Sequence, residues 1–338
     1  MTDTTSDASA IFGTSQFFQR GNYAPVIDEL TEFDLPVEGA IPAELNGWYL
    51  RNGPNPRQAT AHWFTGDGMI HGVRLEGGRA AWYRNRWVRT DSFKKDFPLY
   101  NADGTRNLRS SIANTHVVNH AGKTLALVES SLPYEITNDL ETVGAYDFGG
   151  KLVDSMTAHP KICPTTGELH FFGYGSIFEP YVTYHRADAN GELMINRPLD
   201  VKAHTMMHDF ALTAEHVVFM DLPIVFNLDI ALKGDSDMPY RWDDDYGARL
   251  GVMRRDVRTV RCAGSRSTRA TCSTSPTHTT MARRSCCKPS GIPNYGATVA
   301  HPTKLRSCGV GRSTCSPARS ANVSSTTGRW SSPASTTG

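Results

Sequence analysis

The run of residues that decides the fold class is 121–128, AGKTLALV, in which a turn at Ala121–Lys123 leads into the apolar stretch Thr124–Val128. A turn followed by a short run of β-favouring residues is typical of a strand in a hairpin. The same pattern recurs in the body of the chain, at residues 77–84, 166–172 and 213–220. Helical periodicity is scarce, with short candidates at 42–45 and 91–96. The sequence therefore predicts an all-β fold.

Histidines mark a longer rhythm over these strands. Strand-opening segments that contain a histidine begin near His71, His116, His159 and His208, at separations of 45, 43 and 49 residues. A repeat of this length fits one four-stranded blade of a β-propeller. Because the inner strands of a propeller converge on its axis, one histidine from each blade could meet the others at a central point.

Composition divides the chain in two near residue 260. The 338 residues hold 35 Lys plus Arg against 34 Asp plus Glu, a balance that argues against a protein that binds nucleic acid or a polybasic membrane binder. From Arg261 to Gly338, however, there are nine Arg and two Lys and no acidic residue, so residues 1–260 carry a net charge of −10 and the remainder +11. The tail also lacks Phe and holds six of the seven Cys, and Ser and Thr fill 28 of its 78 positions.

The abrupt change suggests an altered reading frame. A switch to Arg, Ser, Thr, Cys, Pro and Ala without acids is what a GC-rich gene read out of frame would give, and we expect a frameshift near Val257–Arg261. A genuine basic, disordered tail is the alternative. The expected organisation is a polar segment at 1–24, a partial β-propeller domain at 25–256, and a basic tail at 257–338 that is out of frame or disordered.

The body shows no sign of export or membrane insertion. Residues 1–21 are polar and no stretch has 18 uninterrupted apolar residues. Cys163 is the one cysteine before residue 260, as in proteins of a reducing compartment. The sequence thus predicts a cytoplasmic protein.

Two segments could carry chemistry, Thr157–Lys161 and His204–Phe210. Imidazoles on separate rigid strands can hold a metal and leave coordination positions open. On spacing alone, however, the more ordinary interpretation of each histidine is a turn or core residue with satisfied hydrogen bonds. Glu129 ends an apolar strand and could orient a ligand imidazole through its free N–H, or could simply be a solvated strand-end acid.

Several motifs together resemble the carotenoid cleavage oxygenases, non-haem iron enzymes that split polyenes and stilbene-like alkenes. The matching stretches, which lie within residues 25–256, are Tyr49–Pro56, His62–Gly72, Tyr83–Thr90, Asn114–His116, the segment around Glu129, Thr157–Pro160, Met207–Phe210 and Gly251–Arg255. In the last of these, Arg254 stands where the family usually has Pro.

The resemblance implies a seven-bladed propeller with Fe(II) held on its axis by four histidines. It assigns His159 and His208 as the first two iron ligands and Glu129 as the acid that orients a ligand, whereas His204 does not match a ligand position. The implied reaction adds O₂ across a conjugated double bond of a carotenoid, apocarotenoid or stilbene-like substrate and gives two carbonyl products. The charge balance predicts no nucleic-acid partner. The resemblance leaves a peripheral contact with membranes open and indicates neither the exact substrate nor the oligomeric state.

The third and fourth ligands should follow residue 260, where only His278 and His301 occur, neither in a family-like context. We therefore expect an incomplete propeller of about four to five blades, poorly folded and inactive as written. A non-catalytic propeller scaffold is the alternative function. A calcium-dependent propeller lactonase ranks last, because the body shows no converging carboxylate motif.

Overall fold

A computed structural model describes residues 16–60, 62–95, 97–233 and 238–255. These residues belong to one unit, Met1–Arg283, and the second unit, Arg284–Gly338, lies outside them. The predicted frameshift and tail therefore also lie outside the described residues. Within these ranges no helix has the length and apolarity needed to cross a membrane.

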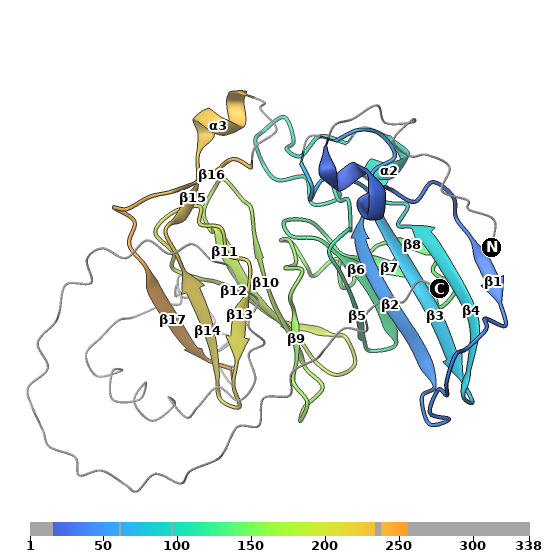
Figure 1. Ribbon diagram of the computed structural model, residues 1–338. Helices are drawn as coiled ribbons and strands as arrows, with labels where there is room; N and C mark the ends of the chain where they lie inside the picture. The colour runs from blue at the N-terminus through green and yellow to red at the C-terminus, as the bar shows by residue number, and fades with distance from the viewer. Residues whose placement is uncertain (1–15, 61, 96, 234–237, 256–338) are drawn as a thin grey trace, which may run out of the picture. The chain divides into compact units, whose positions relative to one another are not determined.

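The described chain is built mainly of antiparallel strands (Figure 1), which confirms the all-β prediction. The first sheet has the order β1-β4-β3-β2, so that the short strand β1 closes the outer edge of a three-stranded meander. Its strands, drawn in blue and cyan in Figure 1, are β1 (Thr31–Phe33), β2 (Gly47–Pro54), β3 (Gly68–Glu76) and β4 (Arg79–Trp87).

The second and third sheets each contain four strands in chain order. The second comprises β5 (His116–His120), β6 (Lys123–Leu127), β7 (Tyr134–Ile136) and β8 (Thr142–Ala145). The third comprises β9 (Lys161–Ile162), β10 (Leu169–Tyr174), β11 (Val182–Ala187) and β12 (Leu193–Pro198). Each sheet is thus formed by one continuous segment of the chain.

Two smaller sheets follow. One has the order β13-β14-β17 and the other pairs β15 with β16. Their strands are β13 (Phe210–Leu212), β14 (His216–Asp221), β15 (Ile224–Phe226), β16 (Tyr240–Trp242) and β17 (Arg249–Arg254). The turns predicted at 77–78, 121–123, 166–168 and 213–215 each join two consecutive strands of a sheet.

Helices are few and short. The candidate at 91–96 is α2 (Asp91–Lys94), whose first turn is capped by the Thr90 hydroxyl, which accepts the Phe93 N–H. The candidate at 42–45 is a turn instead, closed by the Leu45 N–H on the Pro42 carbonyl at 3.1 Å. Two 3₁₀ turns, η1 (Phe17–Gln19) and η2 (Gly21–Tyr23), and the helix α3 (Leu228–Lys233) were not expected from the sequence.

Among the described residues, the core consists of three apolar clusters, each between one sheet and the next in the chain. Alternate strand residues face opposite sides, so Leu125 and Leu127 of β6 join the cluster toward the third sheet and Ala126 the cluster toward the first. In the same way, Phe171 of β10 faces back to the second sheet and Phe172 forward to β13 and β14. A strand with both faces covered is mostly apolar, as the fully buried β10 is apart from His170.

Candidate metal centre

Glu129 lies on a tight turn just after β6. Ser130, the next residue, adopts a left-handed conformation with φ of 64°, which is uncommon for a residue other than glycine. The Arg106 side chain holds this turn by donating from Nε to the Ser130 carbonyl at 2.8 Å. An isolated bridge then pairs Ser131 with Met156, whose N–H donates to the Ser131 carbonyl at 3.0 Å. The bridge brings the Glu129 turn beside the segment that carries His159.

His159 is half-buried and follows a fully buried segment that fixes its position. The Thr157 N–H donates to the Phe172 carbonyl at 2.7 Å, and Thr157 and Ala158 have no exposed surface. The Thr157 hydroxyl oxygen accepts the His159 N–H at 3.2 Å. The backbone at His159 is therefore anchored to the third sheet before β9 begins.

His208 occupies the corresponding place before β13. Its neighbour Met207 is 1% exposed and packs in the cluster between the third sheet and β14, whereas the His208 side chain is 59% exposed. Two contacts join this segment to the His159 segment. The Thr157 hydroxyl donates to the His208 carbonyl at 3.4 Å, and Lys161 forms an ion pair with Asp209 at 2.8 Å.

Glu129, His159 and His208 converge. One ligand atom from each lies within 4.8 Å of the other two. The rings of His159 and His208 have centroids 4.4 Å apart and planes inclined at 62°. Two imidazoles that bind one metal at right angles, with metal–nitrogen distances of about 2.1 Å, hold their centroids about 4.5 Å apart. The observed separation fits two adjacent ligands of a single ion.

The Glu129 carboxylate meets His208 directly. Its Oε1 atom lies 2.6 Å from Nδ1 of His208, although the approach does not meet hydrogen-bond angles. A metal between these two atoms, bound to both at about 2.1 Å and at right angles, would hold them about 3 Å apart. The observed distance is shorter, so the carboxylate contacts Nδ1 of His208 directly. Nε2 of His208 is then left free to bind a metal.

The two imidazoles differ electrostatically. Contact with the Glu129 carboxylate raises the pKa of His208, because the negative charge stabilises the imidazolium. Burial lowers the pKa of His159, and the adjacent His208 lowers it further. His159 Nε2 is buried without a hydrogen-bond partner. A buried nitrogen of this kind normally has a partner, so a neutral imidazole with a free Nε2 fits a metal such as Fe(II), zinc or copper.

Three of the four rhythmically spaced histidines come together. The His116 ring lies 6.1 Å from that of His159 at an interplanar angle of 28°, and His159 contacts His208. His71 instead lies in the middle of β3, where its Nδ1 bonds the Tyr83 hydroxyl at 2.8 Å. The sequence indicated His116 through the histidine spacing and through the family-like stretch Asn114–His116, but His116 was not predicted to be a site residue.

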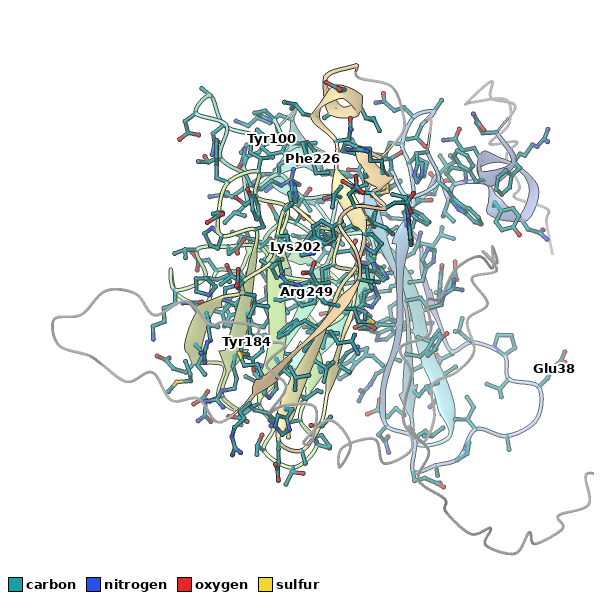
Figure 2. The ribbon with its side chains drawn as sticks, turned by 90° about the vertical axis from the view of Figure 1, so that its left-hand side faces the viewer. Glu38, Tyr100, Tyr184, Lys202, Phe226 and Arg249 are labelled. Atoms are coloured by element: carbon teal, nitrogen blue, oxygen red, sulfur yellow. The ribbon has the colours of Figure 1, made fainter. Side chains whose placement is uncertain are left out.

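His204 belongs to a separate aromatic cluster. Its ring stacks on Phe226 at 4.8 Å, and its Nε2 lies 3.3 Å from the Tyr240 hydroxyl. Phe226 is labelled in Figure 2. Burial, together with the nearby Arg106, lowers the pKa of His204 to about 4. His204 is therefore a packed neutral imidazole, outside the group formed by His159, His208 and Glu129. His278 and His301 lie outside the described residues.

Comparison with known proteins gives one consistent result. Residues 23–282 match the family model described as retinal pigment epithelial membrane protein. This match contains the 25–256 domain expected from the motifs and continues beyond it. The chain is 40% identical to a carotenoid cleavage oxygenase of Mycobacterium tuberculosis, over 71% of this chain and 57% of that protein. It is 39% identical to carotenoid 9,10(9',10')-cleavage dioxygenase 1 of Arabidopsis thaliana, over 70% and 50%.

Solved structures agree with the sequence relatives. The chain superimposes on Pseudomonas brassicacearum lignostilbene dioxygenase with a TM-score of 0.63 and 29% identity, covering 72% of this chain and 54% of the other. It also matches a cobalt-substituted Synechocystis protein with a TM-score of 0.57 and 25% identity, over 69% and 55%. The chain thus spans about half the length of the curated relatives it matches.

Proposed function

The chain belongs to the retinal pigment epithelial membrane protein family, and from that premise we propose that it derives from an Fe(II)-dependent dioxygenase that cleaves a conjugated C=C bond with O₂ to give two carbonyl products. The observation that carries the proposal is the convergence of His159, His208 and Glu129, three residues from three different segments, on one point. Nothing in the described residues favours the alternative of a non-catalytic scaffold.

In this proposal the successive sheets are blades of a β-propeller. The first strand of the second sheet begins at His116, and His159 and His208 each stand two residues before the first strand of the following sheets. Histidines at equivalent places in successive blades would line a shared axis. The two-stranded sheet β15-β16 and the sheet β13-β14-β17 would together form the fourth blade.

His159 and His208 would hold Fe(II) through Nε2, and Glu129 would keep the His208 ring in place by its contact with Nδ1. When bound, the iron would supply open coordination positions at which O₂ is activated beside the alkene. The protein's own contribution is to orient both imidazoles and to keep His159 neutral. The lowered pKa of His159 serves this purpose directly, because only the neutral ring offers a lone pair.

The substrate class follows from the relatives. They are described as acting on carotenoids, at the 9,10 bond in one case, or on lignostilbene. We therefore propose a lipophilic polyene or stilbene-like alkene as substrate, with O₂ as co-substrate. Two imidazoles are half of the four-histidine set that the family resemblance implies, so we propose that this chain binds iron weakly and does not turn over substrate.

Metal titration of the full chain tests this proposal. We expect Co²⁺, which replaces the native metal in the Synechocystis relative, to bind one equivalent to the unaltered chain and to be lost in His159→Ala and His208→Ala. His71→Ala is the matched control, because His71 bonds Tyr83 and lies outside the group. Equal Co²⁺ binding by all four proteins would refute the site.

A second measurement tests the catalytic half of the proposal. We expect no cleavage of β-carotene or a hydroxystilbene by the chain as written, and cleavage to two carbonyl products when the gene's frame after residue 256 is restored. If neither alternative frame encodes strand-patterned sequence with two further histidines, the frameshift hypothesis is wrong. Stoichiometric iron and alkene cleavage by the unaltered chain would refute the prediction of inactivity.

A further inference from the structure

The two imidazoles of the candidate metal centre are held in different ways. The His208 ring has the Glu129 carboxylate 2.6 Å from its Nδ1. Among the described residues, no carboxylate forms an ion pair with His159, and its buried Nε2 has no hydrogen-bond partner. Metal-binding histidines almost always have an outer partner that fixes the ring, and loss of that partner weakens metal binding. Something other than a carboxylate must therefore orient His159.

His116 is placed to do this. It is the first residue of β5, in the second sheet, whereas His159 leads into the third sheet. Its Nδ1 lies 2.8 Å from the Ala158 carbonyl oxygen. A carbonyl can only accept, so Nδ1 carries the proton and donates. The same ring lies 6.1 Å from the His159 ring at 28°, close to parallel. His116 thus restrains the peptide immediately before His159, and its ring lies near the His159 ring.

We propose that His116 is a positioning residue for His159, with the role toward that ligand that Glu129 has toward His208. The inference rests on the proposed metal site. The main restraint on His159 is the hydrogen bond from His116 to the Ala158 carbonyl, because rotation of the 158–159 peptide would swing the His159 ring away from His208. The nearby His116 ring, with its centroid 6.1 Å from that of His159, adds a weaker second contact. His116 lies outside the group of converging ligand atoms, so it acts through His159 and not on the metal.

Two substitutions separate the restraints. His116→Ala removes both the donor and the ring. His116→Asn removes the ring but keeps an N–H donor at the same distance from the backbone, because Nδ2 of Asn stands where Nδ1 of His stands. We expect His116→Ala to weaken Co²⁺ binding by the full chain by about tenfold, the lower end of the effect of removing an outer partner. We expect His116→Asn to recover most of that loss.

A matched control lies on the same strand. His120, the last residue of β5, makes the same kind of bond, from Nε2 to the Gly167 carbonyl at 3.0 Å, and is 7% exposed. We expect His120→Ala to lower the unfolding midpoint while leaving the Co²⁺ affinity and the visible Co²⁺ absorption spectrum unchanged. His116→Ala should change the spectrum, because the ring of one ligand is no longer fixed.

The outcomes distinguish this inference from the proposed function. If the unaltered chain binds no Co²⁺, the metal site itself fails. If the unaltered chain binds Co²⁺ and His116→Ala binds it as tightly with the same spectrum, the metal site stands and the role of His116 is refuted. If His120→Ala weakens binding as much as His116→Ala, the effect is one of general stability and the positioning role is again refuted.

Discussion

Acid should destabilise this protein through His170, a histidine of β10 that is not part of the candidate metal centre. His170 has no exposed surface and bonds two partners. Its Nδ1 lies 2.6 Å from the Tyr184 hydroxyl, and its Nε2 lies 3.3 Å from Nη2 of Arg255. A guanidinium can only donate, so Nε2 is the acceptor and the ring is neutral. Tyr184 is labelled in Figure 2.

The size of the effect follows from the pKa. Burial, and then the charge of Arg255, lowers the pKa of His170 from 6.5 to about 4. Because the folded pKa lies below the unfolded one, the unfolded chain binds the proton first as the pH falls. Stability is therefore unaffected above about pH 6.5 and is lost as the pH falls toward 4. Between pH 7 and pH 5 the loss from this one imidazole is about 2 kcal/mol.

Urea unfolding at pH 7, 6 and 5 measures the loss. We expect the free energy of unfolding to fall over this range in the unaltered chain, and to fall by about 2 kcal/mol less in His170→Gln, whose amide keeps a donor and an acceptor but does not titrate. His204, whose pKa is also lowered to about 4, is present in both proteins, so their difference isolates His170. Identical pH dependence in the two proteins would refute the reasoning.

Three further perturbations have defined outcomes. Glu129→Gln should weaken Co²⁺ binding by about 10–100-fold in a calorimetric titration, whereas Glu135→Gln, which removes a surface ion pair on β7, should not; equal affinities would contradict the contact with His208. Phe171→Ala should cost about 3–5 kcal/mol of unfolding free energy because the ring is fully buried, and a loss below about 1 kcal/mol would show that this cluster is not well packed. Gly68→Ala would place a methyl carbon 2.2 Å from a backbone oxygen and should prevent folding, whereas Gly53→Ala has open space and should fold normally by circular dichroism; a well-folded Gly68→Ala protein would contradict the close approach.

The strands were predictable because the signal for them is local. A turn next to a β-favouring run, as at 121–128, needs no distant partner to be recognised, and the strand β6 (Lys123–Leu127) follows it. The turn at 42–45 and the helix α3 were not foreseen, because segments of one or two turns depend on tertiary contacts more than on their own sequence.

The histidine spacing indicated the site only in part, and the reason is positional. His116, His159 and His208 each stand at or just before the first strand of a sheet, whereas His71 stands in the middle strand of its sheet, opposite Asn85. The regular spacing of the histidines indicates that each belongs to a different segment of the chain. It does not show which strand of the sheet each histidine occupies. The contact between Glu129 and His208 joins residues 79 positions apart, and the sequence indicated only that Glu129 could orient some ligand imidazole, without saying which one.

The three apolar clusters have a consequence for how the molecule is made. Each cluster joins only sheets that are consecutive in the chain. A sheet leaving the ribosome can therefore bury one face against the sheet completed just before it, without waiting for distant sequence, since contacts of short sequence separation cost the least loop entropy. A defect introduced late in translation would then leave the earlier sheets already assembled.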